Sequence, residues 1–314
     1  MIYKKILVPL SGTESAEKSI PYVKNIAKLT RSGVILFSVS LKVFVERRDR
    51  LFTSYLESTA KEFKNEGIKV TTASSYGNVA KEIIEYATNN HIDLIVMSTH
   101  SYTGAKKWMF GSITQKVLYG TMIPVLLVKS KGQDVSTEFN NILVATDGSP
   151  FSEATFPHVV ALAKNTHRKV LILHICEPPI VPSYGSRPIN AKWMRYRDDM
   201  WSEMEKQATN YLKKIMAVMK KQGVNVKGKV IKAQTKDVTK TIRQISKEEN
   251  IDLKIIATKG RTGLDGLIYG RVANKIVEES AKPVLLIFPK EQTPTSSPSN
   301  ILDDIWHGFT SGKV

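Results

Sequence analysis

The chain has 314 residues, of which 42% are hydrophobic and 24% are charged, and its formal net charge is +17. These proportions are those of a soluble globular protein, and no apolar run reaches the ~18–20 residues that span a bilayer, so we expect no membrane partner. The basic residues are spread along the chain without a nucleic-acid-binding motif, which argues against a specific nucleic-acid partner. A strand pattern in place of a signal layout at the start, and the single cysteine Cys176, predict a cytoplasmic location.

The first half of the chain alternates short β-branched runs with longer helical patterns. In chain order we expect a strand over 6–9, a helix over 14–29, a strand over 34–39, a helix ending near 66, a strand over 70–73, a helix over 79–89, a strand over 94–98, a helix over 112–119 and a strand over 125–128. Near-continuous apolar strands separated by helices indicate a parallel sheet that is covered on both faces.

The second half repeats the first. Residues 6–8 (Ile-Leu-Val) recur as 142–144 at an offset of 136, whereas residues 92–94 (Ile-Asp-Leu) recur as 251–253 at an offset of 159. Strands are expected over 142–146, 170–175, 230–233, 253–257 and 284–288. The 23 extra residues are placed between the second and third strands of this copy, where residues 177–188 are typical of a loop. This insertion, at about 177–200, is a candidate lid or contact element over a second site.

The duplication predicts two α/β domains, over 1–132 and 138–290, followed by a flexible tail over 291–314. Each domain is expected to be a doubly wound, Rossmann-like five-stranded parallel sheet of order 3-2-1-4-5. The last strands are apolar and would be hazardous as bare edges, so we expect them to pair as an internal pseudo-dimer. Whether two such chains form a homodimer is left open.

Ligands of such sheets sit beyond the carboxyl ends of the strands, where the winding reverses. In each copy the first strand ends in a glycine turn, Ser11-Gly12-Thr13 or Asp147-Gly148-Ser149. The fourth strand leads through a glycine-containing loop to a helix whose free N-terminal amides could hold an anion.

These segments in this order, followed by a Pro-Val-Leu-Leu strand, resemble the universal stress protein family over residues 1 to about 290. The resemblance implies a stress-linked cytosolic protein. ATP-binding members of the family use G-x-x-G-x9-G-S/T after the fourth strand, an Asp after the first strand, and a backbone contact to adenine at the end of the second.

Carrying the motif over residue by residue identifies a candidate site in each copy. In the second copy the positions are Ala145, Thr146, Asp147, Ile175, Ala257, Gly260, Gly263, Gly270 and Arg271. In the first copy they are Pro9, Ser11, Val39, Ser98, Ser101, Gly111 and Ser112.

Both copies depart from the motif. Ser98 and Ser101 replace the first two glycines and Ser11 replaces the Asp, whereas the second copy has Ala257 at the first glycine and Arg271 at the hydroxyl position. An added Cβ restricts positive φ and close backbone approach to a phosphate. We therefore expect weak binding of ATP or another adenine nucleotide, mainly in the second copy. Arg271 either grips phosphate or obstructs it.

No catalytic residue or metal site is assigned. His100 and His174 have no nucleophile and base at suitable spacing, and Asp93 and Asp252 are interpreted as local partners of the backbone. The expected function is that of a non-enzymatic stress-response or regulatory protein. Two alternatives remain: an enzyme of the related nucleotide-binding α/β group that hydrolyses ATP or transfers a nucleotidyl group, and a ligand-free pseudo-dimer that acts through protein partners.

Overall fold

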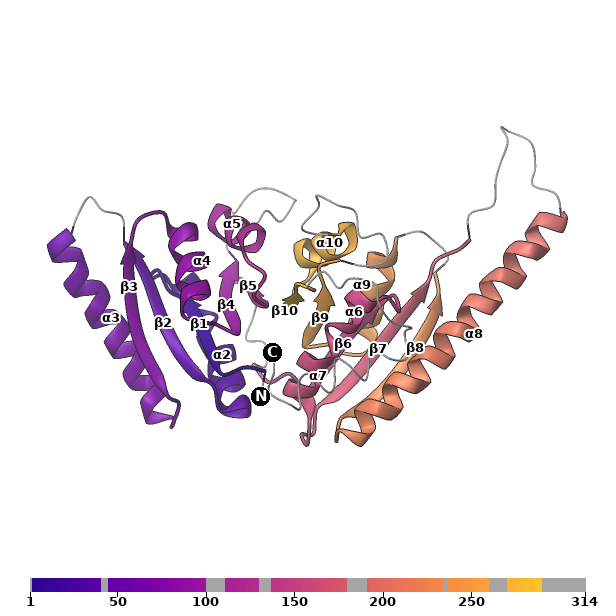
Figure 1. Cartoon of the computed structure of the whole chain (residues 1–314), viewed down its shortest axis with the longest axis horizontal. Helices are drawn as coiled ribbons and strands as arrows, with labels where there is room; N and C mark the ends of the chain where they lie inside the picture. The colour runs from indigo at the N-terminus through magenta and orange to yellow at the C-terminus, as the bar shows by residue number, and fades with distance from the viewer. Residues whose placement is uncertain are drawn as a thin grey trace.

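A computed structural model describes residues 2–40, 45–99, 111–129, 137–179, 191–233, 237–259 and 270–289 (Figure 1). The strands are β1 (Lys5–Pro9), β2 (Gly33–Ser40), β3 (Val70–Tyr76), β4 (Leu94–Thr99), β5 (Val125–Lys129), β6 (Asn141–Thr146), β7 (Lys169–Cys176), β8 (Asn225–Lys232), β9 (Leu253–Ala257) and β10 (Val284–Ile287). The helices are α1 (Glu14–Glu17), α2 (Ile20–Thr30), α3 (Val45–Asn65), α4 (Val79–Asn89), α5 (Ser112–Gly120), α6 (Pro150–Glu153), α7 (Phe156–Ala163), α8 (Ala191–Lys221), α9 (Val238–Glu248) and α10 (Arg271–Glu279).

The strands form one sheet of order β3-β2-β1-β4-β5-β10-β9-β6-β7-β8. Strands β1–β5 make domain 1 and β6–β10 make domain 2, and each has the expected order 3-2-1-4-5. Neighbours within a domain are parallel, whereas β5 and β10 pair antiparallel with Leu126 opposite Leu285. The expected pairing of the last strands is therefore confirmed, and it turns two apolar edges into the middle of a ten-stranded sheet.

Helices cover both faces of the sheet. Side chains of α2, α3, α7 and α8 pack in one apolar core, and those of α4, α5, α9 and α10 pack in the other. Two cores form because alternate residues of the strands point to opposite faces of the sheet. Each core runs through both domains because the ten strands form one continuous sheet. The helix-covered parallel sheet predicted from the apolar strands is confirmed.

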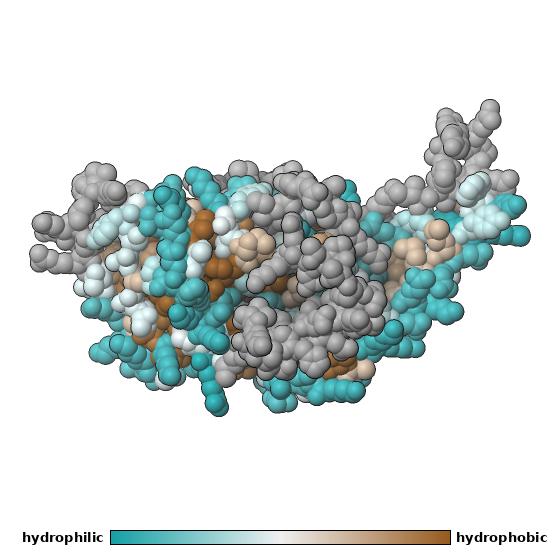
Figure 2. Space-filling view, in the orientation of Figure 1, coloured by the Kyte–Doolittle hydropathy of each residue, from teal (hydrophilic) through white to brown (hydrophobic). Residues whose placement is uncertain are grey.

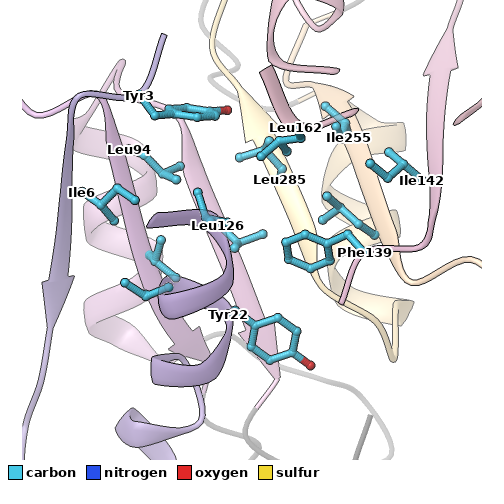
Figure 3. Packing of buried hydrophobic residues seen from close by; sticks show 14 of the residues in the cluster. Tyr3, Ile6, Tyr22, Leu94, Leu126, Phe139, Ile142, Leu162, Ile255 and Leu285 are labelled. Carbon is cyan, nitrogen blue, oxygen red and sulfur yellow. The ribbon is translucent and has the colours of Figure 1, made fainter. Parts of the chain in front are cut away.

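Side chains also join the domains on the face that carries α2 and α7 (Figure 3). The hydroxyl of Tyr3 lies 2.7 Å from Nδ1 of the buried His158, and Tyr22 stacks on Phe139 with ring centroids 5.7 Å apart. Burial lowers the pKa of His158 to about 4, so its imidazole is neutral at pH 7. The two domains are therefore joined by a polar contact, Tyr3 with His158, as well as by an aromatic contact, Tyr22 with Phe139.

The single helix expected over 14–29 is wrong, since the structure has two helices there. α1 ends at Glu17 and α2 begins at Ile20, with a proline in its first turn. The second copy divides in the same way between α6 and α7, again with a proline in the first turn of the later helix. Proline lacks an N–H and suits a helix start, so it favours a new helix over continuation of the old one.

The last part of the insertion expected at about 177–200 is helical. Residues from Ala191 onward form the start of α8, which has 31 residues against 21 in α3. Register places Val226 where domain 1 has Val70, so 20 of the extra residues precede β8 and three follow it. β8 itself begins five residues before the expected 230. Most of the added chain that the structure describes thus lengthens a helix.

Several expectations fall outside the described residues, namely Ser101, Gly260, Gly263, His100, positions 180–190 of the insertion and the tail over 291–314. Among the helices that the structure describes, none has the length and apolar character needed to cross a membrane. Figure 2 shows a mostly hydrophilic surface along the long helix α8.

Candidate functional site

The turn after the first strand of each domain has the same backbone. Gly12 and Gly148 have φ values of 69° and 75°, a left-handed conformation that side chains with a Cβ rarely adopt. Each turn then leads into a short helix that is capped by the next hydroxyl, Thr13 or Ser149. The duplication has therefore kept the shape of this turn in both domains.

The chemistry of the two turns differs. In domain 2, Oδ1 of Asp147 accepts hydrogen bonds from the backbone N–H and the hydroxyl of Ser149, at 2.9 and 2.6 Å. In domain 1, Ser11 contacts the Thr13 hydroxyl at 3.0 Å and brings no formal charge. Asp147 is thus held in a fixed orientation at the carboxyl end of β6, whereas the corresponding place in domain 1 is neutral.

The fourth strand of each domain ends at the same edge as the first. β6 pairs in parallel with β9, and α6 contacts β9, which brings the Asp147 turn close to the end of β9. Ser98 and Ala257 both lie inside the strand ladder, paired with Val128 and Ile287. Ser98 and Ala257, which replace the first glycine of the motif, are therefore part of regular β-strands.

Gly270 has a clear steric role. Its N–H donates to the Thr258 carbonyl at 2.7 Å, and a Cβ added to Gly270 would lie 3.2 Å from that oxygen. This contact brings the start of α10 back to the end of β9. Gly270 and Gly111 are the N-cap residues of α10 and α5, and neither has a side chain that could accept a hydrogen bond from the N–H groups of the first turn.

The remaining candidates line the same edge of the sheet. Pro9, Val39, Ala145 and Ile175 are half-buried at the ends of the first and second strands. Ser112 and Arg271 are exposed at the starts of α5 and α10, and the structure gives Arg271 no carboxylate partner among the residues it describes. Within the described part of the protein, no ion pair therefore fixes the position of the Arg271 side chain.

Sequence reasoning missed a buried polar cluster beneath the domain 2 turn. The Thr146 hydroxyl contacts those of Ser152 at 2.8 Å and Tyr211 of α8 at 3.5 Å. Glu153 is 3% exposed, and burial raises the pKa of its carboxyl to about 7, with the charge of Asp147 adding to the effect and Tyr211 opposing it. The Glu153 carboxyl, whose pKa is close to 7, thus lies below the candidate site.

A repeat signal could have found this cluster. Glu17 and Tyr55 occupy the corresponding places in domain 1, at the offsets that relate the first strands and the third strands of the two domains. Burial first, and then Glu17, raise the pKa of Tyr55, just as burial and then Glu153 raise that of Tyr211. A glutamate in the short helix and a tyrosine in the long helix are therefore duplicated together.

Other candidate residues have structural partners. Oδ2 of Asp93 accepts from the N–H groups of Lys4 and Lys5, at 2.8 Å each, and Asp252 accepts from that of Asn141 at 3.0 Å. The interpretation of both aspartates as backbone partners is confirmed. Cys176 is buried, and His174 is buried with its ring edge-on to Tyr211. Within the described residues, no three His, Cys, Asp or Glu side chains are grouped to hold a metal ion.

Comparison with known proteins agrees with the duplicated fold. The sequence model of the universal stress protein family matches residues 2–129 and again 138–287. The chain belongs to the universal stress protein family. Because the model matches twice, this is a tandem member with two universal stress protein domains.

Individual relatives match one domain or both. Universal stress protein MJ0577 of Methanocaldococcus jannaschii is 30% identical over 158 residues, which cover 42% of this chain and 98% of that protein. A universal stress protein of Mycolicibacterium smegmatis is 20% identical and covers 71% of this chain and 70% of its own. A crystal structure of a universal stress protein from Archaeoglobus fulgidus has a TM-score of 0.66 at 20% identity, covering 90% of this chain and 98% of that one. The two-domain fold is therefore shared along nearly the whole chain.

Proposed function

We propose that this universal stress protein is a cytoplasmic, non-enzymatic regulatory protein that binds an adenine nucleotide weakly, mainly in domain 2. The proposal takes the functional units to be 1–132 and 138–290. It assigns phosphate to the start of α10, and the ribose or phosphate side of the nucleotide to the turn at Asp147. The adenine lies near the backbone of Ile175.

One observation carries the proposal: the oriented Asp147 carboxylate and the start of α10, which receives no side-chain cap from Gly270, lie at the same edge of neighbouring strands. Free N–H groups and the positive end of a helix dipole attract a phosphate. The close approach of Gly270 to Thr258 supports this by setting where α10 begins. Arg271, exposed in the first turn, adds a cation that can reach phosphate oxygens.

Domain 1 offers less to a nucleotide. Its turn has the same left-handed glycine but carries Ser11 in place of the carboxylate, and α5 begins with Ser112, which brings no charge. We therefore propose that binding in domain 1 is too weak to contribute at the same nucleotide concentration.

The alternatives make different predictions. An ATP-hydrolysing or nucleotidyl-transferring enzyme requires a group that activates a nucleophile at the phosphate, whereas Glu153, whose carboxyl pKa is raised, is buried below the site. A ligand-free pseudo-dimer acting through protein partners requires no nucleotide at all. A homodimer of the whole chain is compatible with each reading.

Calorimetric titration of the full chain with ATP tests the proposal. We expect one site, a loss of affinity of about tenfold in Asp147→Asn, and no change in the matched control Ser11→Ala. Two equivalent sites, or equal loss in both variants, would contradict the assignment to domain 2. Release of ADP during the titration would favour the enzyme, and absence of binding would favour the ligand-free pseudo-dimer.

A further inference from the structure

A cavity of about 540 Å³ lies between α9 and α10. It opens beside Asp252 and Lys254, at the start of β9, whereas the candidate nucleotide site lies beyond the other end of that strand. Ile242, Ile251 and Ile276 form apolar wall, and Arg243, Lys254 and Lys282 contribute charge. A volume of this size is typical of a small-molecule site.

Lys254 is the unusual residue of the cavity. It stands in the middle of a parallel sheet, is 5% exposed, and its Nζ donates to the Ser280 hydroxyl at 2.9 Å. Within the described residues no carboxylate pairs with this ammonium. Burial, together with the nearby Lys282, lowers the pKa of Lys254 to about 8, and the group is therefore still largely charged at pH 7. Buried charges are ordinarily paired.

The acidic residues of the cavity have other partners. Glu279 pairs with Arg243 at 3.0 Å, and Asp252 accepts from the backbone of Asn141. A further cation lies close by, since burial first, and then the charge of Lys254, lower the pKa of Lys129 of β5 to about 8. Lys282 and Lys129 therefore both add positive charge near the Lys254 ammonium.

Domain 1 fills the corresponding place with apolar side chains. At the offset of 159, Ile95 stands in place of Lys254 and Ile84 in place of Arg243. Ile84 reaches so close to Gly120 that its Cδ1 would lie 2.5 Å from a Cβ added there. The fold thus accommodates a packed apolar arrangement at this position, and domain 2 has a charged cavity instead.

We propose that the cavity between α9 and α10 binds a small organic anion, with its carboxylate or phosphate head group on Lys254 and its apolar body against the three isoleucines. The head group supplies the negative charge that no carboxylate of the described residues supplies by pairing with this lysine. The site is separate from the candidate nucleotide site and does not depend on it.

The test uses the full chain with labelled isoleucine methyl groups and titration with octanoate and with phenyl phosphate, followed by NMR. We expect saturable shifts at Ile242, Ile251 and Ile276 with at least one of the two anions. The affinity for that anion should fall by about tenfold or more in Lys254→Met, because a charge-assisted hydrogen bond is lost. The exposed lysine of α8 provides the matched control, Lys213→Met, which should leave affinity unchanged.

A comparison on the unaltered protein separates head group from apolar body. Octanamide, which has no charge, should bind about tenfold more weakly than octanoate if octanoate is the anion that binds. The proposal is overturned if neither anion gives saturable shifts at these isoleucines, if Lys254→Met binds as well as the parent, or if octanamide matches a bound octanoate.

Discussion

Replacement of Lys254 by methionine should stabilise the protein. The pKa of Lys254 falls from an ordinary value of 10.5 to about 8 because the ammonium is buried beside another cation. At ~1.4 kcal/mol per pKa unit, keeping this lysine charged in the folded state costs about 3 kcal/mol at pH 7. Methionine has a similar length, carries no charge, and suits a place where domain 1 has Ile95.

The pH dependence gives this prediction its sign. The unfolded chain binds the lysine proton more tightly than the folded chain, so the penalty is complete below pH 8 and disappears as the pH rises towards 10.5. Urea denaturation should show a gain for Lys254→Met of about 3 kcal/mol at pH 7 and less than about 1 kcal/mol at pH 10. Lys213→Met, on the exposed face of α8, should show neither. A gain that is absent at pH 7, or equal at both pH values, would refute the reasoning.

Three further predictions concern the polar groups around the sheet. Glu153→Gln should stabilise the protein by about 2–3 kcal/mol at pH 8 and by little at pH 4, because the raised carboxyl pKa penalises folding only above the ordinary value; thermal melts at both pH values check this, and equal effects would count against it. Tyr3→Phe should lower the free energy of unfolding by about 1–3 kcal/mol, since it leaves the buried His158 ring nitrogen without its hydroxyl, and a double-mutant cycle with His158→Leu should show coupling between them. Arg271→Ser should weaken ATP binding several-fold by calorimetry, and tighter binding would show that the arginine obstructs the site.

Much of the fold followed from local pattern. The central strands are apolar on both faces, and their bounds differ from those expected by one or two residues at most. The sequence pattern puts the start of β8 five residues too late, because β8 is an edge strand whose alternating lysines are also typical of a loop. The break between α1 and α2 was missed although Pro21 marks it, since periodicity continues across the break.

The candidate site was predictable only as far as the repeat extends. The aligned copies pointed to Asp147, Gly270 and the strand ends, and the structure brings these to one edge of the sheet. The sequence did not suggest Tyr211, which comes from a long helix 65 residues away from the Thr146 hydroxyl it approaches. The tyrosine is recognisable in the sequence only through its duplicate, Tyr55.

What the sequence alone determined is the duplicated parallel sheet and the meeting of its last strands, because apolar periodicity and an exposed apolar edge are local properties of the chain. What only the tertiary structure decided is the environment of single charges. Lys254 lies in an apolar strand whichever way the sequence is interpreted, but its burial, its cationic neighbours and the cavity beside it arise from the packing of α9 against α10. The energy of a charge depends on everything around it, and that surrounding set is assembled from segments far apart in the chain.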